Sequence, residues 1–63
     1  MKLKFEKEKD GTYTIMNKKQ DILGHIIFYP RWKDLVWIQD EDIMMSADCL
    51  QQIVDFMESN KNE

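Results

Sequence analysis

The stretch ILGHIIFYPRWKDLVWI, residues 22–38, decides the fold of this chain. Its first apolar run is apolar at odd and even positions alike, as in a strand that is covered on both faces. Pro30 interrupts the stretch, and proline suits the second position of a turn because it has no backbone N–H to donate. We therefore predict strands over residues 22–29 and 34–39, joined by a tight turn.

The residues before this stretch predict two further strands. Apolar residues alternate with lysine and glutamate over residues 2–7, which is typical of a half-buried strand. Asp10-Gly11 is a strong hairpin signal. The segment that follows, residues 12–17, is rich in Thr, Tyr and Ile, which favour strands. A polar segment, residues 17–21, then predicts the turn into the third strand.

The end of the chain predicts one helix, over residues 47–58. Ser46 is a suitable N-cap, and Asp48 lies in the first turn, where the helix dipole favours an anion. We expect the tail, residues 60–63, to fray. An apolar stripe should face the sheet, with two further residues beside it: Leu50, Ile53, Val54 and Met57, flanked by Cys49 and Phe56.

These elements predict a single small α+β domain over residues 1–63, in which an antiparallel meander of three to four strands is covered on one face by the C-terminal helix. Gly24 predicts a bulge or a close backbone approach within its strand. Because a bulge shifts the side-chain alternation by one residue, the sequence leaves open which face meets the helix. The two competing sets are Met16, Leu23, Ile27, Tyr29, Val36 and Ile38 against Tyr13, Ile15, Ile26, Phe28, Leu35 and Trp37.

The size and composition of the chain favour association with another protein. A domain of about 60 residues is marginally stable and usually needs disulfides, a metal, a partner or dense packing. Cys49 is the only cysteine, so no disulfide forms within the chain, and with His25 it cannot supply four zinc ligands. We expect no metal or cofactor. No apolar run reaches the roughly 20 residues of a membrane span, and the charged N-terminus is no signal peptide, so we expect no membrane contact and a cytoplasmic location.

The net charge of −3 hides an asymmetry, since residues 1–33 carry +4 and residues 34–63 carry −7. Such a split can orient partners or self-association. The alternative is that the two halves interleave in the fold and the charges largely cancel.

Four residues around the proline are candidate partner-binding residues: Tyr29, Arg31, Trp32 and Trp37. Tryptophan and arginine are enriched among the residues that dominate protein interfaces. We expect them to bind a protein partner, either a host protein or a second copy in a homodimer. In the alternative interpretation, Trp32 folds back and covers the small core.

Other candidate sites receive weaker support. Cys49 near a helix start and His25 could form a dyad, but neither lies in a catalytic motif, and we predict that the protein is not an enzyme. The acidic run 40–42 lacks the spacing of a calcium loop. The alternative function is nucleic-acid binding through the lysine-rich N-terminal half and exposed aromatics, although the negative net charge makes nucleic acid a poor partner.

Several short motifs together resemble a group of short hypothetical proteins of bacteriophages and other bacterial mobile elements. The shared pattern is a DGxY hairpin, an LGxI strand, a Trp-Arg or Trp-Lys turn and a CLxxIxxF helix. The matching residues are Asp10-Gly11-Thr12-Tyr13, Leu23-Gly24-His25-Ile26, Trp32-Lys33, Ser46 and the helix from Cys49 to Phe56.

The resemblance covers about residues 10–58 and implies a genomic setting rather than an activity. In this chain the turn reads Trp32-Lys33 where others have Trp-Arg, and Met57 follows Phe56 where others have leucine. Small phage proteins often bind a host protein. We therefore expect a non-enzymatic, protein-binding accessory protein in the host bacterial cytoplasm, and inhibition of a host defence or regulatory protein is one form that this binding could take.

Overall fold

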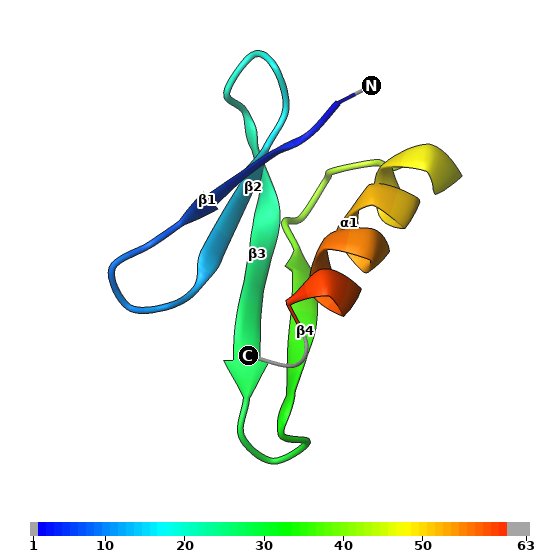
Figure 1. The fold of residues 1–63 in the computed structure, drawn as a ribbon. Helices are drawn as coiled ribbons and strands as arrows, with labels where there is room; N and C mark the ends of the chain where they lie inside the picture. The colour runs from blue at the N-terminus through cyan, green and yellow to red at the C-terminus, as the bar shows by residue number, and fades with distance from the viewer. Residues whose placement is uncertain (1, 61–63) are drawn as a thin grey trace.

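The computed structural model describes residues 2–60 and has an α+β fold, as predicted. Figure 1 shows one antiparallel sheet in the order β1-β2-β3-β4, with a single helix across one of its faces. Each strand pairs with its neighbour in the chain, which makes the sheet a meander. The elements are β1 (Lys4–Lys7), β2 (Tyr13–Met16), β3 (Ile22–Tyr29), β4 (Asp34–Gln39) and α1 (Ala47–Ser59).

The bounds of β3 and β4 coincide with the ranges expected from the sequence, whereas β1 and β2 are shorter. The three hairpins all close on a residue with positive φ: Gly11 at 92°, Gln20 at 66° and Lys33 at 52°. A left-handed residue before the second strand is a common way to close a loop of this length. The first hairpin also uses the Asp10 carboxylate, which accepts hydrogen bonds from the Thr12 backbone N–H (3.0 Å) and hydroxyl (2.7 Å).

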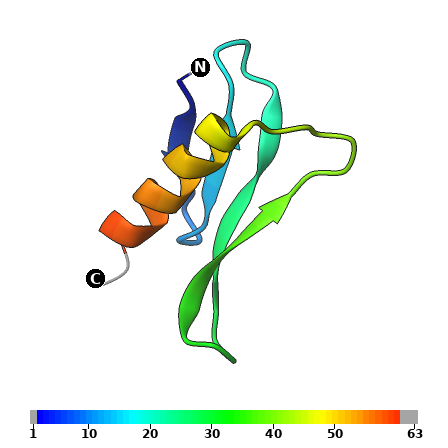
Figure 2. The ribbon, with the colours of Figure 1, turned by 90° about the vertical axis from the view of Figure 1, so that its right-hand side faces the viewer.

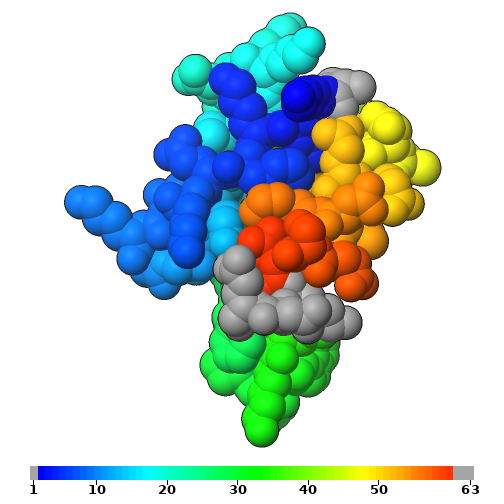
Figure 3. Space-filling view, viewed as in Figure 1, coloured from blue at the N-terminus to red at the C-terminus, as the bar shows by residue number. Residues whose placement is uncertain are grey.

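The β3–β4 turn places Pro30 as expected. The backbone N–H of Trp32 donates to the carbonyl of Tyr29 at 3.1 Å, so Pro30 is the second residue of a hydrogen-bonded turn. Figure 3 shows that this hairpin extends past the lower end of the helix. Arg31 and Trp32 are therefore exposed at a projecting tip.

Helix α1 begins where the sequence predicts. The Ser46 hydroxyl accepts a hydrogen bond from the Cys49 backbone N–H at 3.4 Å, which makes Ser46 the N-cap. Asn60 is the C-cap, and its backbone N–H donates to the carbonyl of Met57 at 3.2 Å. The predicted fraying of residues 61–63 lies outside the described residues.

The register decides which set of side chains faces the helix. Tyr13 pairs with Ile26, and Ile26 pairs with Trp37, so these three lie on the same face. All three belong to the hydrophobic core or pack against it. The helix therefore covers the set that begins with Tyr13 in the sequence. The buried core comprises Leu3, Ile15, Leu23, Ile26, Cys49 and Ile53.

Leu23 joins this core although simple alternation places it on the other face. The pairing shifts from Ile15 opposite Gly24 to Met16 opposite Ile22, which leaves Leu23 as the extra residue of a bulge. The bulge turns Leu23 toward the helix, where it is 8% exposed. Gly24 thus marks an irregularity in the strand, as predicted.

The predicted buried face of the helix is wrong, because α1 is rotated about its axis relative to the expectation. Phe56 stacks on Phe5 of β1, with ring centroids 4.3 Å apart, and meets Tyr13 of β2 edge-on at 4.9 Å. These contacts turn α1 toward β1 and β2. As a result, Leu50 and Val54 of the expected stripe are 40% and 48% exposed. The buried side is instead formed by Cys49, Ile53, Phe56 and Met57.

Candidate partner-binding surface

The face of the sheet opposite the helix is apolar along β3 and β4. The register places Ile27 opposite Val36 on this outer face, and His25 opposite Ile38. Figure 2 shows the helix on the other side of the sheet. On β1 the same face carries Lys4 and Glu6, which pair with Met16 and Thr14 of β2, so most of its apolar residues lie on β3 and β4.

A shallow groove of about 320 Å³ lies on this half of the sheet. Trp32 is 68% exposed at one end of it, and Ile38 is 49% exposed. The indole of Trp32 meets the ring of Tyr29 edge-on, with centroids 4.9 Å apart. The contact holds Trp32 against the strand pair although the residue lies in a turn. The lining residues are Ile27, Tyr29, Trp32, Val36, Trp37 and Ile38. We call this surface the outer groove.

The structure brings three of the four candidate residues to the outer groove, namely Tyr29, Trp32 and Trp37. Arg31 is exposed at the hairpin tip and does not line the groove. The alternative position for Trp32, folded back over the core, is not what the structure shows, because its side chain packs on Tyr29 and stays largely exposed.

Trp37 serves the core as well as the groove. Its indole passes over Gly24 on the helix-facing side and packs against the core. Its Nε1 is buried without a hydrogen-bond partner. Trp37 therefore packs against the core and also lines the outer groove, and its role in partner binding stays a prediction.

Three aliphatic groove residues, Ile27, Val36 and Ile38, were not among the candidates from the sequence. They belong to the set of alternating residues that the helix leaves uncovered. Alternation therefore identifies these residues as one set. It does not say whether that set faces the helix, because the bulge expected at Gly24 can shift the alternation by one residue.

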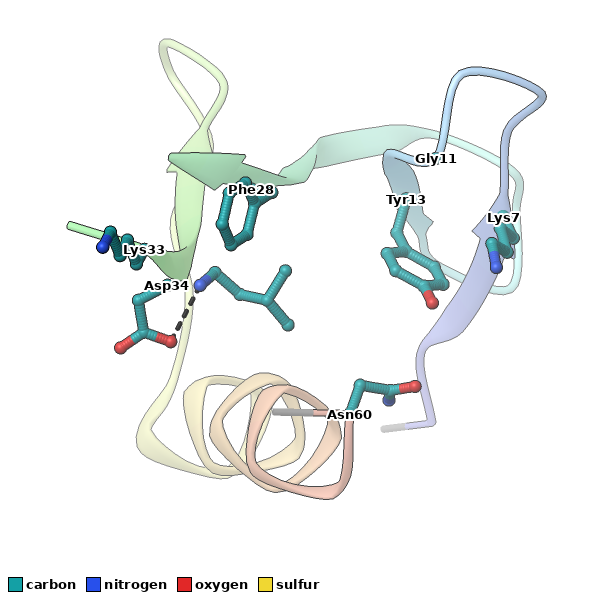
Figure 4. Close-up of a pocket in the computed structure, with 8 residues that line it drawn as sticks. Lys7, Gly11, Tyr13, Phe28, Lys33, Asp34 and Asn60 are labelled. Atoms are coloured by element: carbon teal, nitrogen blue, oxygen red, sulfur yellow. Dashed lines mark hydrogen bonds between the residues drawn. The ribbon is translucent and has the colours of Figure 1, made fainter. Parts of the chain in front are cut away.

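A second hollow, of about 220 Å³, lies on the helix side below the end of α1. In Figure 4, Tyr13 and Phe28 enter it from β2 and β3, and Asn60 closes it from the helix end. Phe28 is 57% exposed because the helix does not reach this end of the sheet. The Asp34 carboxylate beside it accepts the Leu35 backbone N–H at 2.8 Å. The hollow thus combines aromatic walls with the charged groups of Lys7, Lys33 and Asp34.

His25 and Cys49 lie on opposite sides of the sheet. His25 is on the outer face, where its Nδ1 is 3.4 Å from the Thr14 hydroxyl. Cys49 is 7% exposed in the core beneath the helix. The two therefore cannot act together. Within residues 2–60, no group of three or more His, Cys, Asp or Glu side chains is placed to hold a metal ion.

Three lysines near the N-terminal edge strand lie apart from the outer groove, whereas Lys33 follows Trp32 in the β3–β4 turn. Lys2, Lys4 and Lys18 surround Leu3 at the β1 edge of the sheet. The aromatic groove lies at β3 and β4, toward the other edge. Single-strand binding needs bases to stack beside the basic track, and this separation does not favour it.

The chain matches no protein-family model, and neither the curated proteins nor the solved structures gave a match. In the part of the chain that the structure describes, no helix has the length and apolar character needed to cross a membrane.

Proposed function

We propose that this protein is a non-enzymatic protein-binding module and that the outer groove is the surface on which its partner docks. The carrying observation is the outer groove itself, an open, largely apolar surface on a face that the chain does not cover. Trp32 stands at its projecting end, 68% exposed. Large apolar side chains gathered on one open surface commonly mark an interaction site.

The arrangement of residues fits the anatomy of a protein interface. Trp32 and Tyr29 form a fixed aromatic pair, and Ile27 and Val36 form a cross-strand aliphatic floor beside it. Aromatic anchors that fill a pocket on the partner supply most of the binding energy in such interfaces. Arg31 lies at the exposed tip beside the pair, where it can meet an acidic group on the partner.

The resemblance to short phage proteins suggests which partner to look for. A host protein inside the bacterial cell, for example a defence or regulatory protein, is the target that we propose. Binding would block that target by occupying its surface.

The test is affinity capture from the bacterial host with the full chain as bait. Trp32→Ala and Ile38→Lys should both lose the captured protein, since one removes the anchor and the other places a charge in the groove. The matched control is Met44→Ala, because Met44 is 95% exposed and does not line the groove.

The purified partner should then bind the parent chain directly. We expect Trp32→Ala to weaken its affinity by about 30-fold or more, which corresponds to about 2 kcal/mol. Equal capture by the parent chain and by both groove variants would refute the groove as the docking surface.

A further inference from the structure

The free edge of β4 is open to another strand. Asp40 donates its N–H to the carbonyl of Leu23 at 2.9 Å, which identifies this pair as a hydrogen-bonded position of the β3–β4 ladder. Because such positions alternate, residues 36 and 38 also point their backbone groups toward β3. The N–H and C=O groups of Trp37 and Gln39 and the C=O of Leu35 therefore point away from the sheet, whereas the Leu35 N–H donates to the Asp34 carboxylate at 2.8 Å. Figure 2 looks onto this edge, and none of the other helices and strands of residues 2–60 passes across β4.

The two edges of the sheet differ in how they are protected. On β1, two lysines and a glutamate discourage pairing, and the Leu3 N–H just before it donates to Gln52 Oε1 of the helix at 3.0 Å. On β4, Asp34 at the start of the strand is the one charged residue, and beyond it residues 35–38 read Leu-Val-Trp-Ile, without a charge, a proline or a bulge. An uncharged, regular edge of this kind is a template for strand pairing.

The helix adds apolar surface on the same side of the molecule. Gln52 and Phe56 contact residues of the β1 side, as shown by the bond to Leu3 and the stack on Phe5. Leu50 and Val54 lie on the opposite flank of the helix, with Ile53 between the two flanks. They therefore face the β4 side, where they are 40% and 48% exposed.

The charges at the two ends of β4 have opposite sign. Arg31 and Lys33 lie in the turn that precedes the strand and outnumber the single acidic residue beside them, Asp34. Asp40, Glu41 and Asp42 follow the other end of the strand. In an antiparallel pair of β4 strands, the start of one strand lies beside the end of the other. Each basic turn is thereby brought next to an acidic turn, twice in the assembly.

We propose that β4 pairs antiparallel with β4 of a second copy of this chain, forming a two-fold symmetric dimer with one continuous eight-stranded sheet. The two-fold axis passes through the middle of β4, at Val36 or Trp37. Leu50 and Val54 of the two helices are brought together on one side of that sheet. On the other side, the two outer grooves become neighbours on one surface. A two-fold interface uses the same patch on both copies, which this edge satisfies.

Sedimentation velocity and native mass spectrometry of the full chain test the proposal. We expect a monomer–dimer equilibrium between micromolar and millimolar concentration. Val54→Lys should weaken the dimer by about tenfold or more, because it buries a charge at the interface. Gln51→Lys is the matched control, since Gln51 is exposed on the side of the helix away from the sheet, and it should leave dimerisation unchanged.

Two variants in which the charges of the turns are reversed show whether loss of the dimer comes from the turn contacts or from a damaged fold. Arg31→Glu/Lys33→Glu makes both turns acidic, and Asp40→Lys/Glu41→Lys removes the acidic turn. Each variant alone should be largely monomeric. Mixed together they should form a one-to-one heterodimer, because both turn contacts are again of opposite sign.

A monomeric parent chain at millimolar concentration would overturn the proposal, as would charge variants that dimerise like the parent or fail to pair when mixed. Loss of the dimer through Ile38→Lys and Trp32→Ala while Val54→Lys has no effect would place the contact on the outer groove, which also contradicts pairing through β4. Capture of a host partner can succeed or fail independently of all these outcomes.

Discussion

Gly24 lies directly beneath the indole of Trp37. A Cβ placed at residue 24 would come within 2.5 Å of Cη2 of Trp37 and would also meet the backbone carbonyl of Ile38. The absent side chain lets the tryptophan cross from β4 over β3 and close the core at that point. The position of Trp37 on β4 therefore depends on the absence of a side chain at Gly24 of β3.

We predict that Gly24→Ala destabilises the fold by about 2 kcal/mol, because it overpacks a well-filled site. Urea unfolding followed by far-UV circular dichroism measures the loss. In Gly24→Ala/Trp37→Leu the added methyl group should cost less than it does beside the indole, because only the backbone contacts with the Ile38 carbonyl and the Gln39 Cα then remain. Strictly additive effects of the two substitutions would contradict a direct contact.

Phe56 should be the helix residue on which docking depends most. We predict that Phe56→Ala costs about 3 kcal/mol, since it removes a half-buried ring and both of its aromatic contacts. A domain of this size could then be largely unfolded. Val54→Ala, at a 48% exposed position on the other flank, should cost about 0.5 kcal/mol or less. Thermal unfolding measures the loss of stability in the two variants. Equal losses would show that Val54 is as buried as Phe56 and that the helix is rotated differently.

The Asp10 carboxylate should make the first hairpin sensitive to acid. Hydrogen bonds from the Thr12 backbone and hydroxyl lower the pKa of Asp10 below its ordinary value of 3.8. A group whose pKa is lowered in the folded state stabilises it above the unfolded pKa, and this contribution is lost as the pH falls through the folded value. The midpoint of thermal unfolding should therefore fall with acidification more steeply in the parent chain than in Asp10→Asn. Parallel pH profiles for the two proteins would contradict this.

Trp32 should matter for binding and hardly at all for folding. We predict that Trp32→Ala changes the free energy of unfolding by about 0.5 kcal/mol or less, because its side chain is 68% exposed and packs on a single ring, that of Tyr29. Chemical denaturation checks this. A loss of several times that size would show that the residue supports the core, and the binding experiment would then need a different variant.

The hairpin turns, the helix cap and the strand order follow directly from local residues. Asp10-Gly11, Pro30 and Ser46 each do what their backbone chemistry favours. The rotation of the helix could not be predicted in the same way. Ile53 is central both in the periodic pattern and in the structure, and the stack of Phe56 on Phe5 then turns the helix away from Leu50 and Val54. That contact joins residues far apart in the chain, so helical periodicity does not report it.

The candidate site was predictable as an excess of apolar residues and not as a list of contacts. Both faces of β3 and β4 are apolar, so alternation alone could not assign Trp37 to the core or Ile38 to the surface. The bulge at Leu23 decides the phase, and its position depends on how β2 and β3 pair.

The placement of α1 over β1 and β2 has a consequence for how this small protein can change. Its anchoring contacts reach Leu3, Phe5 and Tyr13, whereas Tyr29 and Trp32 touch each other at the far tip of the sheet. The residues that hold the helix are thus largely separate from those of the proposed docking surface. Substitutions at the tip can therefore alter the proposed docking surface while the contacts of the helix keep the chain folded.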